Sequence, residues 1–292
     1  MALWRLHIRP YGGEANHPLA VSFCLRNSLI GMGWALPDEP VTQSSDLAWY
    51  KSAAAKHYGD DRSWASVVAF ASAAVGDMVW FRNLDGRYYV AELTAPWEYR
   101  YISPEQIAAD IVNFRSARIV EVGLADAIPG KIVSCFRPAR TFQSILSTGM
   151  LAFSAKQLDI TLDGMSASPD VYEFMSDGDI EDLVFIYLQF IGWYVVPGTR
   201  RPTTSHYEFV LINRTTGKRA IVQVKSGNTS LNAASYAGND RTFLFAACES
   251  YGSDIPENVT ILSRGELSEF MRGRPELLPS AVRTWIRMAG LT

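Results

Sequence analysis

Two short segments decide the fold of the C-terminal half of this 292-residue chain: YEFVLI at Tyr207 to Ile212 and RAIVQVK at Arg219 to Lys225. Both segments are largely apolar, which favours strands. The residues between them, Asn213 to Lys218, are polar and include a glycine, which is typical of a turn. The pattern therefore predicts a β-hairpin with its turn near Thr215 to Gly217.

Three side chains of this hairpin are expected to meet on one face of the sheet. Gln223 and Lys225 are two residues apart, so both point to the same side while Val224 points to the other. Glu208 lies on the partner strand at nearly the same level. This combination suits phosphodiester cleavage, because oxygen ligands hold Mg²⁺ or Mn²⁺, the metal acidifies a water, and the lysine stabilises developing negative charge.

The residues around the hairpin predict a mixed sheet flanked by helices. Asp177 or Asp179 is suited to cap an apolar helix that begins near Glu181 and ends at Gly192. Further buried strands are expected at 242–247 and 259–262, and helices at 231–237, 266–272 and 280–288.

From Glu181 through YEFVLI to QVKSG, the chain resembles the PD-(D/E)XK nuclease superfamily, in the Mrr-type restriction endonuclease variant in which glutamine replaces the middle acid. The resemblance implies that Glu208 is the first acidic metal ligand, Gln223 the second ligand and Lys225 the catalytic lysine. Glu181 matches the additional glutamate of the first helix, with the adjacent Asp182 as its alternative. The resemblance also implies a restriction-endonuclease-like fold. The catalytic residues would be Glu181, Glu208, Gln223 and Lys225, and Mg²⁺ would be held by Glu208, Gln223 and Glu181.

Other interpretations of the hairpin stay open. An ordinary α/β domain with a cross-strand pair between Glu208 and Lys225 would show the same residues. The amide of Gln223 is also compatible with a weakly catalytic or non-catalytic descendant that keeps the fold to bind nucleic acid. His206 is a lone histidine, which more often packs than contacts substrate. From Pro197 to Leu231 there are six Lys or Arg and one acid, which favours a surface that faces phosphates.

Composition and charge place the domain boundary. Between Asp159 and Asp182 there are eight acidic residues and no Lys or Arg, with glycines and a proline that interrupt any periodicity. We therefore expect an α+β or α/β protein of two domains: residues 1–155, an acidic linker at 156–176, and the nuclease domain at 177–292.

The N-terminal half is expected to consist mainly of short strands. LWRLHIRP, AVSFCLRN, GDMVWFRN and YYVAEL are strand candidates, and Asp85-Gly86 between the last two predicts a hairpin turn. The residues from Asp46 to Ala73 suit one or two helices packed on a sheet or barrel.

Five segments of this half resemble the PUA-like group, which includes EVE and related modified-base readers: SLIGMGWAL, VGDMVWFRN, YYVAEL, PWEYRY and DIVNFR. The resemblance implies a small β-barrel with helices that holds one flipped base between aromatic walls. Trp34, Trp97 and Trp80 are the candidate walls, and Asp110 or Asn113 the candidate reader of the base edge. Core packing is the alternative for each tryptophan.

Cysteine usage and hydropathy limit the remaining classes. Cys24, Cys135 and Cys248 are far apart in apolar stretches, so neither disulfides nor a zinc site is indicated. The longest apolar run, Leu183 to Val196, is too short to span a bilayer, which predicts a cytoplasmic protein without membrane partners. The net charge of −3 does not exclude nucleic acid, because phosphate binding depends on local basic surfaces.

These observations together predict a modification-dependent, type IV-like DNA restriction endonuclease that defends against phage. Its partner would be double-stranded DNA with modified bases, and cutting both strands with one site per chain favours a homodimer. The alternatives are a non-catalytic nucleic-acid-binding module, or an N-terminal domain that senses RNA or carries a protein partner.

Overall fold

The structure is a computed structural model, and it describes residues 1–8, 17–36, 43–59, 61, 63–101, 103–162, 170–199, 206–238 and 240–290. The chain divides into two compact units. Unit 1 comprises Met1–Ile128 and Ile132–Ala167, and unit 2 comprises Pro129–Lys131 and Ser168–Thr292. The described residues form a mixed α+β protein with one sheet in each unit.

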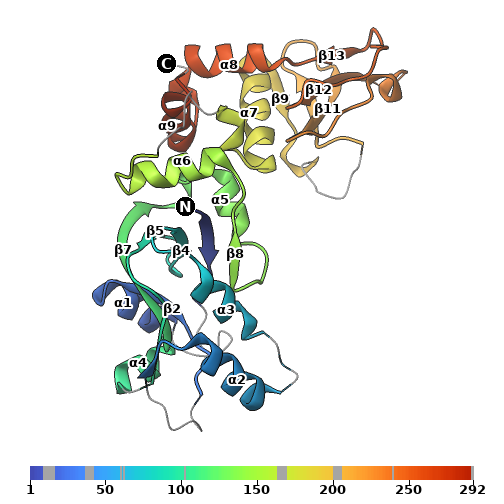
Figure 1. The fold of residues 1–292 in the computed structure, drawn as a ribbon. Helices are drawn as coiled ribbons and strands as arrows, with labels where there is room; N and C mark the ends of the chain where they lie inside the picture. Colours follow the sequence, from blue (N-terminus) through green and yellow to red (C-terminus); the bar gives the residue numbers. More distant parts are fainter. Residues whose placement is uncertain are drawn as a thin grey trace. The chain divides into compact units, whose positions relative to one another are not determined.

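Unit 1 contains a curled half-barrel sheet (Figure 1). Seven of its described strands follow the order β3-β6-β7-β5-β4-β1-β8, and β2 joins the sheet by pairing with β7. The longest strand, β7, also pairs with β5 and β6, so it connects β3 and β6 on one side of the sheet to β5, β4, β1 and β8 on the other. The strands are β1 Leu3–Leu6, β2 Leu29–Met32, β3 Gln43–Ser44, β4 Met78–Arg82, β5 Tyr88–Leu93, β6 Glu98–Arg100, β7 Asn113–Gly123 and β8 Phe142–Ser144.

Helices are interspersed with these strands. Asp46 caps α2 by accepting from the backbone N–H groups of Ala48 and Trp49, and Ser103 caps α4 in the same way through Gln106. The helices are α1 His17–Arg26, α2 Leu47–Tyr58, α3 Ala65–Ser72, α4 Pro104–Ala109, α5 Gly130–Cys135 and α6 Thr148–Gln157, with a short 3₁₀ turn, η2, at Ala125–Ala127.

One strand prediction in unit 1 is wrong, and the others hold. Most of the AVSFCLRN segment, from Ala20 to Arg26, belongs to α1 rather than to a strand. Its buried residues include Ala20 and Cys24, four apart, which is the spacing of one helix face, and Pro18 in the first turn suits a helix start. The β4–β5 hairpin and the two helices between Asp46 and Ala73 are confirmed.

A buried carboxylate fixes the N-terminal strand in unit 1. Asp77, only 4% exposed, accepts hydrogen bonds from the backbone N–H of Ala2 at 2.6 Å, the indole N–H of Trp4 at 2.9 Å and the N–H of Ala74 at 3.0 Å. These contacts lie where β1 runs parallel to β4. Three donors on one carboxylate hold the two strands in register.

Unit 2 contains a five-stranded mixed sheet in the order β13-β12-β11-β10-β9. The β9, β10 and β11 neighbours are antiparallel, whereas β11, β12 and β13 run parallel. Figure 1 shows α7 beside β9. The elements are η3 Val171–Glu173, α7 Asp177–Phe190, β9 Trp193–Val195, η4 Pro197–Thr199, β10 Phe209–Asn213, β11 Arg219–Lys225, η5 Ala233–Tyr236, β12 Arg241–Ala246, β13 Val259–Ile261, α8 Arg264–Gly273, η6 Pro275–Leu277 and α9 Ser280–Met288.

The expected hairpin, the helix before it and the two later strands are confirmed in unit 2, whereas 231–237 holds a 3₁₀ turn instead of a full helix. The expected linker, 156–176, is described only in part, since 163–169 lie outside the described residues. Its last part contains η3, and Val171, Tyr172, Phe174 and Met175 are buried in unit 2.

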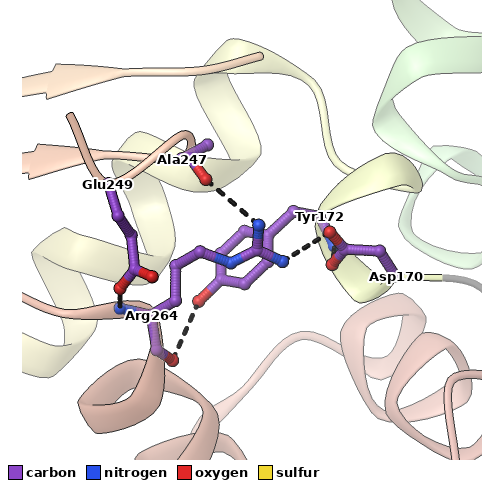
Figure 2. A network of polar contacts seen from close by, with 5 residues as sticks. All are labelled: Asp170, Tyr172, Ala247, Glu249 and Arg264. Carbon is purple, nitrogen blue, oxygen red and sulfur yellow. Dashed lines mark hydrogen bonds and ion pairs between the residues drawn. The ribbon is translucent and has the colours of Figure 1, made fainter. Parts of the chain in front are cut away.

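A network around Arg264 secures this segment to the sheet (Figure 2). The Arg264 guanidinium lies 4.5 Å from the ring centre of Tyr172, pairs with Asp170 and donates to the carbonyl of Ala247 at 3.1 Å. The Arg264 backbone N–H donates to Glu249 at 2.9 Å. One arginine at the start of α8 thus links η3 to the end of β12.

No helix in the part of the chain that the structure describes combines the length and the apolar composition needed to cross a bilayer.

Replacement of Asp77 by alanine should lower the free energy of unfolding of unit 1 by about 2–3 kcal/mol, because three donors lose one acceptor. Chemical denaturation measures the change. Asp85→Ala, in the exposed β4–β5 turn, is the control and should stay near wild type. Equal stability of the two variants would contradict the assigned role of Asp77.

Candidate functional site

The β10–β11 pairing sets the level of the candidate active site in unit 2. Phe209 stands opposite Val222, and the N–H of Glu208 donates to the carbonyl of Val222 at 2.7 Å. Glu208 therefore lies across from Gln223 at the end of the hairpin that is remote from its turn. Because β11 has β12 on its other side, Gln223 sits in the interior of the sheet.

Glu208, Gln223 and Lys225 meet at this level, and we call them the hairpin site. The Glu208 Oε1 atom accepts from Gln223 Nε2 at 3.0 Å and from Lys225 Nζ at 3.4 Å. Gln223 is fully buried, whereas the side chains of Glu208 and Lys225 are 16% and 34% exposed. The site thus opens to solvent on the lysine side, and the structure brings together three of the four predicted catalytic residues.

The amide oxygen of Gln223 is unsatisfied. Gln223 Nε2 donates to Glu208, but Oε1 is buried with no hydrogen-bond partner. Leaving a buried polar atom unpaired costs about 1–3 kcal/mol, so such atoms are uncommon unless a ligand or an ion completes them. Amide and carboxylate oxygens are ligands that a hard cation such as Mg²⁺ accepts.

The start of α7 lies beside the end of β11. Ser226, which follows Lys225, donates its hydroxyl hydrogen to the carboxylate of Asp177, the first residue of α7. Ser176 and Asp179 form a capping box that fixes this helix end. Glu181 is half-buried one turn after Asp177 and so on the same helix face, whereas Asp182 is turned away from that face.

Tyr236 is a member of this region that sequence reasoning did not single out. It is buried in η5, and the His206 ring stacks on it with centroids 4.5 Å apart and planes at 18°. Burial first, and then the charge of Glu208, raises the pKa of the Tyr236 phenol. The phenol therefore stays protonated near neutral pH. The spacing of residues within the hairpin does not predict that Tyr236 lies near Glu208, because Tyr236 comes from a separate turn, η5.

Groups of three or more His, Cys, Asp or Glu side chains placed to hold a metal ion are absent from the described residues. A cation at the hairpin site would therefore depend on the amide of Gln223 in addition to carboxylates. Arg214, Lys218 and Arg219 are exposed along the hairpin, and Arg200 and Arg201 lie outside the described residues.

Unit 1 contains an aromatic cluster, which we define as Trp34, Trp49, Tyr50, Tyr58, Trp64, Trp97 and Tyr99. Tyr50 lies at its centre, with ring centroids 5.6 Å from Trp97, 5.5 Å from Tyr99 and 6.5 Å from Trp64. Tyr50, Trp97 and Tyr99 are buried, and the other four members are half-buried. Two of the predicted base-binding tryptophans, Trp34 and Trp97, belong to this cluster.

The backbone at Gly33 and Trp34 is held against the cluster from two sides. Asn113 Nδ2 donates to the carbonyl of Gly33 and lies 3.3 Å from the hydroxyl of Tyr50, which donates to the carbonyl of Trp34 at 2.8 Å. A Cβ atom at Gly33 would overlap the Asp110 carboxylate. Trp34 has a φ of 68°, a conformation that bulky residues rarely adopt. Asp110 and Asn113 thus shape the turn that positions Trp34.

Burial, with a smaller contribution from Asp110, keeps two phenols of the cluster protonated. Burial first, and then the charge of Asp110, raises the pKa of Tyr58. Burial is likewise the main cause of the raised pKa of Tyr50, to which Asp110 contributes. Both hydroxyls therefore remain neutral hydrogen-bond donors at physiological pH.

Trp80 lies apart from these rings. It is fully buried, donates from Nε1 to the Ser154 hydroxyl at 2.8 Å and stacks on Phe153 of α6. Its neighbours Val79 and Phe81 point to the opposite face of β4, where the core that contains the aromatic cluster lies. The structure does not bring Trp80 to the other predicted base-binding residues.

Comparisons with known proteins give no match for this chain among family models, curated proteins or solved structures.

Replacement of Gln223 by glutamate should make stability depend on Mg²⁺. Without metal, the free energy of unfolding of the variant should be about 1–3 kcal/mol lower than that of wild type. The reason is that the amide that donates to Glu208 becomes a second buried carboxylate. With Mg²⁺ the carboxylate pair gains a cation, so the melting temperature should rise more than that of wild type.

Thermal unfolding in EDTA and in Mg²⁺ measures this difference. Gln189→Glu is the matched control, because Gln189 is exposed near the end of α7. An equal response of both variants to Mg²⁺ would argue against a cation site at Gln223.

Proposed function

We propose that unit 2 is a Mg²⁺-dependent nuclease domain of the PD-(D/E)XK type that hydrolyses phosphodiester bonds in DNA. One observation carries the proposal: the Glu208 carboxylate, the buried amide of Gln223, whose oxygen is unpaired, and the Lys225 ammonium meet at one end of the hairpin. The succession of α7, β9, β10, β11 and β12 around a mixed sheet supports a restriction-endonuclease-like fold.

The donor set fits a hard divalent cation. Glu208 and Gln223 would hold Mg²⁺, or Mn²⁺ in its place, through carboxylate and amide oxygens, and Glu181 is the proposed third ligand. When bound, the metal supplies Lewis acidity and lowers the pKa of a coordinated water. The neutral amide of Gln223 keeps the negative charge of the site low, so substrate phosphate meets less repulsion.

Lys225 contributes a positive charge that this chain itself positions. Its ammonium is anchored on Glu208 and is one-third exposed, so it can reach a phosphate oxygen without losing that contact. There it would stabilise the extra negative charge that develops when water attacks phosphorus. The exposed Arg214, Lys218 and Arg219 provide further positive charge to bind the phosphate backbone.

Unit 1 gives the nuclease its proposed selectivity. The aromatic cluster supports a PUA-like, EVE-type domain that inspects a flipped, modified base before unit 2 cuts. The whole chain would then act as a modification-dependent restriction endonuclease in phage defence, working as a homodimer to cut both strands. Recognition of RNA or of a protein partner by unit 1 is the alternative.

Wild-type protein with Mg²⁺ should cleave phage DNA with modified bases faster than the same DNA without them. Lys225→Ala should lower the cleavage rate by about a hundredfold or more, because a transition-state charge contact is lost. Lys218→Ala, in the exposed turn, removes the same charge and should change the rate only severalfold.

Gel analysis of DNA incubated with each protein measures both effects. Absence of cleavage of every substrate, or equal losses in the two lysine variants, would overturn the nuclease proposal.

A second candidate function is a nucleic-acid-binding module that keeps the nuclease fold without catalysis. The donation from Gln223 Nε2 to Glu208 favours it, because that hydrogen bond satisfies part of the carboxylate without metal. Metal affinity distinguishes the two candidates.

Calorimetric titration with Mn²⁺ should show one site in wild type that weakens about tenfold or more in Glu181→Ala, because a ligand is lost. Asp182→Ala, the neighbouring residue on α7, is the control and should bind as wild type does. No measurable metal binding, even with DNA present, would favour the binding module, and a larger effect at Asp182 would overturn the assignment of Glu181.

A further inference from the structure

Tyr236 covers the face of the unit 2 sheet that carries the hairpin site. It packs in a hydrophobic cluster with Leu244 and Ala246 of β12. In the parallel pairing of β11 with β12, Leu244 stands beside Gln223 and Ala246 stands beside Lys225. Residues paired in this way point to the same side of a sheet. The ring of Tyr236 therefore lies on the side to which Gln223 and Lys225 point.

Two contacts fix the position of Tyr236 over this face. The imidazole of His206 stacks on its ring, with centroids 4.5 Å apart and planes at 18°. His206 comes only two residues before Glu208, so the stack brings Tyr236 to the carboxylate end of the hairpin site. The backbone of η5 is held separately, because Asn258 Nδ2 donates to the carbonyl of Tyr236 at 2.9 Å.

The hydroxyl group of Tyr236 differs from those of the other buried tyrosines that the structure describes in unit 2. The Tyr172 hydroxyl bonds to the carbonyl of Arg264 at 3.5 Å. The Tyr251 hydroxyl accepts from the backbone N–H of Ala246 at 2.9 Å. The Tyr236 hydroxyl makes no hydrogen bond within the described part of the chain, and its oxygen is not sealed in the core. Since buried tyrosines usually pair this group, an open hydroxyl at a polar site is placed to meet a ligand.

The electrostatics of the site keep this hydroxyl a hydrogen-bond donor. Burial first, and then the charge of Glu208, raises the pKa of the Tyr236 phenol. A neutral phenol can donate its hydrogen, whereas a phenolate would repel both the carboxylate and an incoming phosphate. The Tyr236 hydroxyl can therefore offer its hydrogen to an oxygen of a bound substrate.

We propose that Tyr236 is a further catalytic residue of the hairpin site and donates a hydrogen bond to a non-bridging oxygen of the scissile phosphodiester. His206 is its positioning residue, because the flat stack fixes the plane of the phenol ring. The inference rests on the proposed nuclease function and adds a neutral donor to the Lys225 ammonium. Negative charge grows on the phosphate oxygens as water attacks phosphorus, so the contact strengthens in the transition state.

Tyr236→Phe tests the hydroxyl alone, because the ring is kept. With Mg²⁺ and phage DNA that carries modified bases, kcat should fall about tenfold or more while KM stays within about twofold of wild type. The melting temperature should not fall, because no hydrogen bond within the described part of the chain is lost. Calorimetry with Mn²⁺ should give the wild-type affinity, since the hydroxyl is not a metal ligand in this scheme.

Tyr251→Phe is the matched control, because Tyr251 is a buried tyrosine of the same hydrophobic cluster. This change removes hydrogen bonds to the backbone of Ala246 and Leu262. Its melting temperature should therefore fall, while kcat should stay within about twofold of wild type. A structural role for Tyr236 would instead make the two variants behave alike.

His206 is tested through its effect on Tyr236. His206→Phe keeps a planar ring and should retain about half of kcat or more, whereas His206→Ala should lower kcat severalfold. In the Tyr236→Phe protein, His206→Ala should have little further effect, because the group that it positions is absent. The same loss in both backgrounds would overturn the positioning role of His206.

The outcomes separate this inference from the nuclease proposal. No cleavage by wild type would overturn both. Cleavage by wild type with an unchanged kcat in Tyr236→Phe, or with weakened Mn²⁺ binding in that variant, would overturn only the contact of Tyr236 with the phosphate. A covalent adduct of the protein with DNA that is absent from Tyr236→Phe would also overturn it, because the hydroxyl would then be a nucleophile.

Discussion

The hydrogen bond between Gln223 and Glu208 is the contact on which the account of unit 2 depends. An amide in the interior strand of a sheet is costly to bury, and here only its NH₂ group is satisfied, by a carboxylate from the neighbouring strand. This arrangement holds Glu208 toward the same end of the sheet as Lys225. The start of α7, which holds Asp177, and the turn with Tyr236 bring further polar groups near the hairpin site.

Both units show the same physical signature. In each, a fully buried amide side chain donates from its nitrogen and leaves its oxygen unpaired: Gln223 in unit 2 and Asn113 in unit 1. Native structures retain few such atoms, and each calls for an explanation, such as a ligand or an ordered water that completes its hydrogen bonds. The surroundings differ in chemistry: a carboxylate and an ammonium in unit 2 suit a metal and a phosphate, whereas indole and phenol rings in unit 1 suit a planar base.

The sequence alone predicts those features of the fold that depend on residues close together in the chain. The two-residue spacing of Gln223 and Lys225 and the short turn after Asn213 predicted the hairpin and the shared face of its side chains. Tyr236 lies near Glu208, and Asp177 contacts Ser226, only because segments distant in the sequence pack together. The spacing of residues along the chain does not predict such contacts. The segment at 20–27 was expected to be a short strand, but it belongs to α1, where Ala20 and Cys24 are buried on one helix face. The 80-residue separation between Asn113 and Gly33 likewise hides the role of the asparagine in the turn before Trp34.

The proposed nuclease activity requires that the amide oxygen of Gln223 and the carboxylate of Glu208 bind a divalent metal. A crystal of the full chain soaked in Mn²⁺, with diffraction collected where manganese scatters anomalously, tests it most directly. We expect an anomalous peak about 2.0–2.3 Å from Gln223 Oε1 and from a Glu208 oxygen, with Glu181 turned toward it. No peak at the hairpin site, or a peak held by other residues while Gln223 keeps its unpaired oxygen, would contradict it.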